Sequence, residues 1–160
     1  MTLSESKIVQ DQELLKDRLA ALPGPLVFTN GCFDILHRGH VAYLEEAATL
    51  GASLIVGVNS DASVARQNKE SSRPINPLDD RMALLAALGC VSLVVSFGED
   101  TPLELIKTAR PDHLVKGGDW QPDKIVGADF VASYGGKVHA VPVRFERSTS
   151  NLIERIRRHG

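Results

Sequence analysis

The sequence predicts an α/β fold: a Rossmann-like, doubly wound parallel five-stranded sheet with helices on both faces, in a single domain. Short runs rich in β-branched residues alternate with helical patterns along the chain, and this alternation is typical of a parallel sheet wrapped by helices. The 160 residues, 43% of them hydrophobic, suffice for one domain with a buried core. Neither an internal repeat nor a low-complexity tract interrupts the pattern.

The first 25 residues are expected to form a helical lead-in to a domain spanning 26–160. Apolar residues in this lead-in are spaced as on an amphipathic helix: Ile8, Leu14, Leu15, Leu19 and Leu22. The Pro23-Gly24-Pro25 cluster ends the helix, because it neither continues a helix nor pairs in a sheet.

Strands and helices then alternate to the end of the chain. The strands are expected at 26–29, 53–59, 91–96, 113–116 and 137–141. Gly51 ends a helix over 40–50, and Pro77 opens a helix that runs to 88. A third helix is expected to start with Thr101 as its N-cap and Pro102 in its first turn. A final helix is expected over about 149–158.

Composition excludes several classes of protein. Lys and Arg number 18 and Asp and Glu 20, giving a net charge of −2, so no basic field favours nucleic acid. No apolar run is long enough to cross a membrane, and the polar first ten residues show no signal peptide. The two cysteines, Cys32 and Cys90, do not form a disulfide framework. We expect a reduced, cytoplasmic protein without nucleic-acid or membrane partners.

The strongest chemical signal is the turn between the first predicted strand and the following helix, which reads TNGCFDILHRGH over 29–40. In an open α/β sheet, ligands bind beyond the carboxyl ends of the strands, where amides and a helix N-terminus hold anions. Gly31 and Gly39 allow backbone to approach a ligand closely, and His37 and His40 project to one side. Phosphate is the expected ligand, and the imidazoles are expected to stabilise the charge that develops on a transferred phosphoryl group.

Two other interpretations of this turn stay open. His37 and His40 also suit a purely structural role, capping the helix and satisfying polar neighbours. Cys32, His37 and His40 could instead hold a zinc ion, although no Cys-x-x-Cys or His-Glu-x-x-His frame supports a metal site. We therefore predict no metal ligated by the protein.

The runs GCFD at 31–34 and HRGH at 37–40 resemble the HxGH signature of the nucleotidyltransferase superfamily, which includes cytidylyltransferases and adenylyltransferases. From about residue 26 onward, further runs resemble the heptose 1-phosphate adenylyltransferase family: VNSD at 58–61, RPINP at 73–77, DR at 80–81, EDTP at 99–102, KGGDW at 116–120, IVGA at 125–128 and YGG at 134–136. In many members this unit is fused to a sugar kinase. The kinase half is absent from this chain, so a free-standing transferase is expected.

The resemblance implies transfer of AMP from ATP to D-glycero-β-D-manno-heptose 1-phosphate, giving ADP-heptose and pyrophosphate for lipopolysaccharide core synthesis. ATP is then a substrate, and Mg²⁺ is held mainly by phosphates and water. The partners implied are the nucleotide, the sugar phosphate, a second copy of the chain and a separate heptose kinase upstream. The alternatives are a cytidylyltransferase acting on glycerol 3-phosphate or another polyol phosphate, and a non-catalytic nucleotide-binding module.

The family match implies that His37 and His40 meet the triphosphate and that Lys69 contacts phosphate, although a charge run such as 66–73 is more usually a solvated surface. The same match implies that residues of the run 29–40 contact the nucleotide: Thr29, Asn30, Gly31, Cys32, Phe33 and Gly39. In-line transfer needs positioning and charge neutralisation more than a protein nucleophile, so Cys32 is not expected to be catalytic.

Other candidates follow later strands. Arg81 either reaches the phosphates or braces Asp79 and Asp80. Asn59 and Asp61 end the second predicted strand, where they contact substrate or serve as turn and cap residues.

The loop after the fourth predicted strand suits a ligand with a flat or hydroxylated surface. Lys116, Gly118 and Asp119 are expected to contact the nucleotide, and Trp120 the substrate, unless the indole is a packing anchor. Asp34 is expected to contact substrate as well.

Hydroxyl groups precede the last helix, where they offer donors to phosphate and can also cap the helix: Ser148, Thr149 and Ser150. Both Arg144 and Arg147 lie near them, and the sequence does not assign the nucleotide-facing arginine to one of the two.

Overall fold

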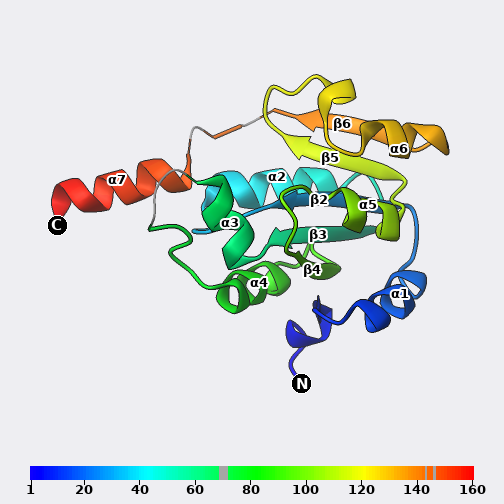
Figure 1. Cartoon of the computed structure of the whole chain (residues 1–160), viewed down its shortest axis with the longest axis horizontal. Coiled ribbons are helices and arrows are strands. Elements are labelled where there is room, and N and C mark those ends of the chain that lie inside the picture. The colour runs from blue at the N-terminus through cyan, green and yellow to red at the C-terminus, as the bar shows by residue number, and fades with distance from the viewer. Residues whose placement is uncertain (69–71, 143, 146) are drawn as a thin grey trace.

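Six parallel strands form one sheet in the computed structural model, which describes residues 1–68, 72–142, 144, 145 and 147–160 (Figure 1). The strands are β1 (Ile8–Val9), β2 (Leu26–Gly31), β3 (Ser53–Asn59), β4 (Leu93–Phe97), β5 (His113–Gly117) and β6 (Lys137–Val141). Their order in the sheet is β1-β4-β3-β2-β5-β6, and all neighbouring pairs are parallel.

Helices cover both faces of the sheet, which confirms the predicted fold class. Side chains of α1 (Gln12–Ala20), α5 (Leu103–Ala109) and α6 (Ala128–Ser133) pack in one core cluster. Those of α2 (Arg38–Ala48) and α4 (Leu78–Ala87) pack in the other. The remaining elements are α3 (Asp61–Gln67), α7 (Thr149–His159) and the 3-10 turns η1 (Glu5–Lys7) and η2 (Pro122–Lys124).

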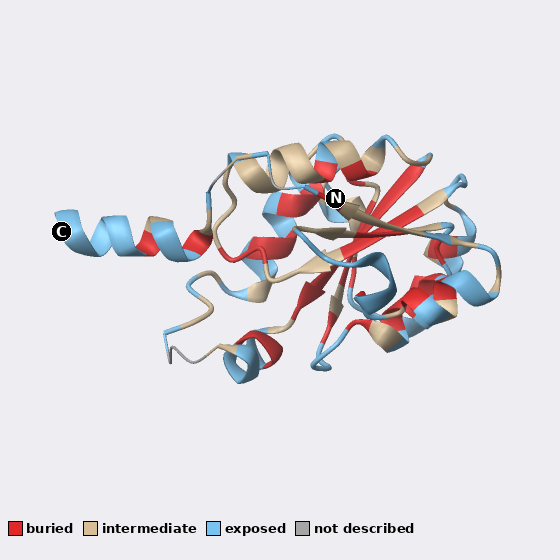
Figure 2. Ribbon diagram, turned by 90° about the horizontal axis from the view of Figure 1, so that it is seen from above, coloured by how far each residue is buried: buried red, intermediate tan, exposed pale blue. Residues whose placement is uncertain are grey.

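The two clusters arise because successive side chains of a strand point to opposite faces. On β2, Val27 joins the cluster under α2 and Phe28 the cluster under α5. All seven residues of β3 are buried, as expected for a central strand covered on both faces. Figure 2 shows the buried residues on the strands and on the helix surfaces turned toward them.

The N-terminal segment differs from the helix expected there. Its first part forms η1 and then β1, where Ile8 pairs with Val94 and Val9 with Val95. The sheet therefore has six strands, and the expected number of five was wrong. A strand of two residues is too short to show an alternating pattern, so Ile8 was taken with the helical spacing that belongs only to the residues of α1.

The later elements follow the prediction closely. The last helix was expected over about 149–158 and spans Thr149–His159. The expected cap at Thr101 was wrong, because α5 begins at Leu103 with Pro102 in the N-cap position. No helix within the described ranges has the length and apolar character needed to cross a membrane.

The strand order places the carboxyl end of β2 between those of β3 and β5. After β2 the chain builds β3 and β4 on one side, and it later returns to build β5 and β6 on the other side. Such a reversal leaves a crevice outside the carboxyl ends of the strands, where α/β proteins bind ligands.

Candidate active site

A cavity of about 300 Å³ opens at the carboxyl ends of β2 and β5. The turn after β2, the first turns of α2 and the segment before α7 enclose it. Ten residues predicted from the sequence as site residues line it: Asn30, Gly31, Cys32, Phe33, His37, Gly39, His40, Lys116, Ser148 and Thr149. The sheet thus brings residues from both ends of the chain to one hollow.

His37 and His40 form the centre of this cavity. His37 is the N-cap residue of α2, and the two rings stack with centroids 3.8 Å apart and planes inclined by 19°. The Nδ1 atoms of both rings are buried and have no hydrogen-bond partner within the described part of the chain. Buried polar atoms are normally satisfied, so these two nitrogens mark a place for a ligand or water.

Both imidazoles are neutral at neutral pH. Burial, and then the neighbouring His37, lower the pKa of His40 to about 4. Burial, and then Arg147, lower the pKa of His37. Neutral imidazoles offer one N–H donor and one acceptor each, and a nearby anion favours their protonation.

Cationic side chains surround the imidazoles. Lys116, Arg144 and Arg147 line the cavity, and both arginines left open by the sequence are therefore at the site. Burial lowers the pKa of Lys116. Arg144 Nε lies 3.0 Å from Glu46 Oε2, in an ion pair between an exposed arginine and a partly exposed glutamate. This charge pattern suits a polyanion such as a nucleotide triphosphate.

Tyr43 was missed by the sequence analysis, although it lies one turn after His40 on the same face of α2. Its hydroxyl is hydrogen-bonded to Thr29 Oγ1 and donates to Val115 O at 3.2 Å, which joins β2 to β5 beneath the cavity. Burial raises the pKa of Tyr43 to about 12. Thr29 is fully buried by this contact and does not line the cavity.

The thiol of Cys32 lines the cavity but is not activated. Burial raises the pKa of Cys32 despite nearby Arg81 and Arg73, so the thiol keeps its proton at neutral pH. The zinc interpretation gains no support from the geometry, because His37 and His40 stack face to face and do not converge on a point. Among the described residues, no group of three or more His, Cys, Asp or Glu could hold a metal ion.

Arg81 does not line the cavity, and its expected contact with the nucleotide stays a prediction. Its side chain is fully buried on α4. It donates to Cys32 O and Asn59 O at 2.8 Å each, and its Nη2 lies 2.6 Å from Asp61 Oδ1. The guanidinium therefore joins the ends of β2 and β3.

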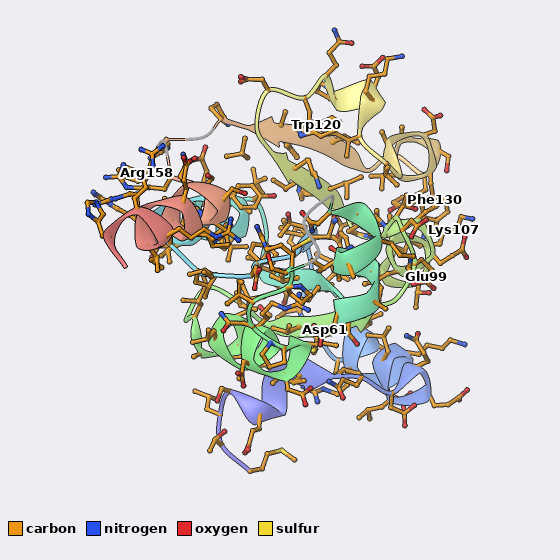
Figure 3. All side chains as sticks on the ribbon, turned by 60° about the vertical axis from the view of Figure 1, so that its left-hand side comes forward. Asp61, Glu99, Lys107, Trp120, Phe130 and Arg158 are labelled. Carbon is orange, nitrogen blue, oxygen red and sulfur yellow. The ribbon has the colours of Figure 1, made fainter. Side chains whose placement is uncertain are left out.

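Three residues expected to contact substrate also lie outside the cavity. Asp61, labelled in Figure 3, begins α3 and pairs with Arg81, while Ser60 is the N-cap. Asn59 is buried and donates to Ser63 Oγ at 3.0 Å. Asp34 is 1% exposed, and its carboxylate accepts from backbone and side-chain donors of the segment 73–76.

The hydrogen bonds of Asp34 decide its charge. Burial alone raises the pKa of a carboxyl, but the backbone N–H groups of Asn76 and Ile75 and the side chain of Arg73 outweigh it and lower the pKa of Asp34. Asp34 is therefore ionised and structural in this conformation.

A second hollow of about 100 Å³ adjoins the cavity and shares Asn30 and Lys116 with it. Trp120 lines this hollow with 49% of its surface exposed, on the loop after β5 (Figure 3). Lys124 was not predicted and lines it too.

Gly118 takes φ +108° in the same loop, a conformation that favours glycine. Gly118, Asp119 and Ser150 line neither hollow. Lys69, also predicted at the site, lies outside the described residues.

A parallel sheet whose switch point carries a cationic, imidazole-lined cavity agrees with the nucleotidyltransferase class that the sequence resembles. Residues 28–155 match the model of the cytidylyltransferase-like family, and the chain belongs to that family.

Similar proteins agree with this assignment. The chain is 58% identical to the D-beta-D-heptose 1-phosphate adenylyltransferase of Bordetella bronchiseptica, over 96% of this chain and 95% of that protein. It is 57% identical to the bifunctional protein HldE of Syntrophotalea carbinolica, over 82% of this chain but only 26% of that relative.

Solved structures show the same fold. A lipopolysaccharide core biosynthesis protein from Thermoplasma volcanium has a TM-score of 0.59 and 31% identity, over 76% of this chain and 98% of that one. Pantothenate synthetase from Thermus thermophilus has a TM-score of 0.61 at 21% identity, over 91% of this chain and 67% of that one. The second likeness shows the fold alone.

The free energy of unfolding should fall as the pH drops from 6.5 to 4. The unfolded chain binds a proton on His40 near pH 6.5, whereas the folded chain does so only near its pKa of about 4. The contribution of His40 to the free energy of unfolding is therefore fully present above pH 6.5, and up to about 3 kcal/mol of it is lost as the pH falls to 4. Urea unfolding should show a smaller loss for His40→Asn. His37 and His139, whose pKa values burial also lowers, leave a residual slope, and an equal loss in both proteins would contradict the assignment.

Gly39→Ala should reduce turnover without reducing stability. A Cβ at position 39 would lie 3.0 Å from Cε1 and Nδ1 of His37, so the imidazole must shift by a few tenths of an ångström. Alanine otherwise favours the helix by up to about 1 kcal/mol. We expect kcat to fall about ten-fold or more with an unchanged or higher Tm. Gly89→Ala, where a Cβ meets nothing within 4 Å, is the matched control and should keep full kcat.

Proposed function

We propose that the chain transfers the AMP moiety of ATP to D-glycero-β-D-manno-heptose 1-phosphate, forming ADP-heptose and pyrophosphate. The observation that carries the proposal is the stacked His37 and His40 pair with unpartnered, buried Nδ1 atoms, in a cation-lined cavity at the switch point of the sheet. The name of the Bordetella bronchiseptica relative supports the acceptor.

The larger cavity is the proposed site for ATP. Lys116, Arg144 and Arg147 supply the positive charge that offsets a triphosphate. Ser148 and Thr149 stand where α7 begins, and they offer hydroxyl groups and a helix N-terminus to phosphate oxygens. Binding of the polyphosphate favours protonation of the imidazoles, because an anion raises the pKa of a neighbouring histidine.

The smaller hollow is the proposed site for the sugar phosphate. Trp120 offers an exposed aromatic face to the apolar side of a sugar ring. Lys116 lines both hollows, so its ammonium can bridge the acceptor phosphate and the nucleotide. Lys124 adds a second cation to the acceptor side.

The reaction needs no nucleophile from the protein. An oxygen of the sugar 1-phosphate attacks the α-phosphorus of ATP, the bond to the bridging oxygen of the β-phosphate breaks, and pyrophosphate leaves with that electron pair. His37 and His40 donate hydrogen bonds to the phosphate oxygens that gain charge. Mg²⁺ suits this site as a partner of phosphates and water, since Glu46 is the only carboxylate-bearing residue among the described residues that line the cavity.

The family resemblance also implies a pathway, a compartment and an oligomeric state. ADP-heptose serves lipopolysaccharide core assembly, and its acceptor substrate requires a kinase that phosphorylates the sugar at C1. We infer that this kinase is a separate protein, that the reaction takes place in the cytoplasm, and that the transferase acts as a homo-oligomer.

A nucleotide panel tests the proposal through pyrophosphate release. ATP with heptose 1-phosphate should be the productive pair among ATP, CTP and GTP combined with heptose 1-phosphate or glycerol 3-phosphate. His37→Asn and His40→Asn should each lower kcat by roughly 10²- to 10³-fold, as loss of a charge-stabilising donor does. Turnover of CTP with glycerol 3-phosphate would favour a cytidylyltransferase, and ATP binding without turnover a nucleotide-binding module.

Trp120→Ala should raise KM for the sugar phosphate by about ten-fold, equivalent to about 1.4 kcal/mol, with KM for ATP changed less than about two-fold. The indole contacts only the acceptor in this proposal, and Trp120→Phe should keep most of the affinity because the aromatic face remains. Leu84→Ala, which removes a similarly exposed apolar side chain on α4, is the control. Equal changes in both KM values would remove Trp120 from the acceptor site.

A further inference from the structure

Phe33 has an unusual backbone at the centre of the site. Its φ is +49°, in the left-handed region that residues other than glycine rarely adopt. Such a conformation is strained and persists only where the surrounding structure enforces it. Phe33 is also 6% exposed, so the strained residue is packed inside the molecule.

Hydrogen bonds hold the carbonyl groups of Cys32 and Asp34, the residues before and after Phe33. The carbonyl of Cys32 accepts from Arg81 Nη1 at 2.8 Å. The carbonyl of Asp34 accepts from Asn76 Nδ2 at 2.6 Å. Because the peptide before Phe33 and the peptide after Asp34 are both fixed, the short segment that contains Phe33 is anchored at each end.

Asn76 contacts both Asp34 and Arg81 through its backbone as well. The N–H of Asn76 donates to Asp34 Oδ1 at 2.9 Å, and the carbonyl of Asn76 accepts from Arg81 Nε at 3.0 Å. The buried charged groups of Asp34 and Arg81 are therefore both hydrogen-bonded to the backbone of Asn76. Removing a partner from such a network leaves a buried charge short of a hydrogen bond, which is expensive.

The ring of Phe33 is the part that reaches the site. Its ring stands edge-on to His40, with centroids 5.2 Å apart and planes inclined by 66°. Gly31 makes this placement possible, because a Cβ there would lie 3.0 Å from Cε2 of Phe33. His40 is thus held between the stacked ring of His37 and the edge of Phe33.

We propose that Phe33 is a positioning residue for His40, and that the Asp34, Asn76 and Arg81 network acts on the reaction by fixing the backbone of Phe33. The role of His40 in the reaction rests on the function proposed above. The placement of its ring does not. In this view the two buried charges, which touch no part of the cavity, determine the direction in which the His40 imidazole points.

The test is made without nucleotide, on the full chain, by NMR titration of the histidine imidazoles. The other titratable and charged groups that line the cavity also affect the measured pKa of His40, and no variant changes them: His37, Cys32, Tyr43, Glu46, Lys116, Arg144 and Arg147. Phe33→Leu removes the aromatic edge, and Asn76→Ala removes one hydrogen bond to the network without touching His40. We expect both variants to move the pKa of His40 from about 4 toward its ordinary value and to weaken its ring-current shifts.

Kinetics provide the second measurement. Both variants should lower kcat by about ten- to a hundred-fold, as misplacement of a reacting group does, with KM for ATP changed less than about three-fold. Phe97→Leu is the matched control, because Phe97 is equally buried in the cluster on the other face of the sheet. It should lower Tm while leaving the signals of His40 and kcat near those of the wild type.

The outcomes separate clearly. If Asn76→Ala lowers Tm but leaves the imidazole of His40 unchanged, the network is only structural and the proposal is overturned. The same holds if Phe97→Leu shifts His40 as much as Phe33→Leu does. Should Phe33→Leu fail to fold, Asn76→Ala carries the test alone. A failure of the proposed function is recognised independently, as absence of turnover by the wild-type chain whose His40 titrates as described.

Discussion

The placement of β2 between β3 and β5 is the constraint on which the site depends. Because the chain builds outward from β2 in both directions, the loops leaving its carboxyl end diverge and open a hollow above it. Tyr43 fixes the separation of β2 and β5 from below through Thr29 and Val115. The imidazoles and Lys116 are positioned by this frame, because they follow β2 and end β5.

Charge in this molecule is distributed unevenly. The chain as a whole is slightly negative, yet the cavity at the switch point of the sheet gathers Lys116, Arg144 and Arg147 around two neutral imidazoles. A cation-rich surrounding opposes protonation of His37 and His40 until an anion enters. The arrangement therefore favours interactions that strengthen as negative charge accumulates on the phosphates, which is the condition for lowering a barrier and not merely for binding.

The fold class could be predicted from the sequence because alternating segments are a strong local signal. The glycine- and histidine-rich turn is also a local signal, and its residues meet in one cavity. Sequence reasoning failed where the signal is not local. β1 has two residues and shows no period. For Arg81 and Asp34, polar residues near a ligand motif, the sequence did not reveal the burial and the hydrogen-bond partners that the fold supplies from distant segments. The hollow beside Trp120 depends on side chains brought together only by the tertiary fold.

The course of α7 has a practical consequence. Its first residue, Thr149, lines the cavity, whereas the helix then runs outward and carries Arg158 far from the sheet (Figures 1 and 3). A helix is stiff over such a length, so its two ends turn together. A spin label or fluorophore attached at Arg158 would stand clear of the chemistry while registering any tilt imposed at Thr149, which offers a spectroscopic gauge of occupancy that leaves the reacting groups unmodified.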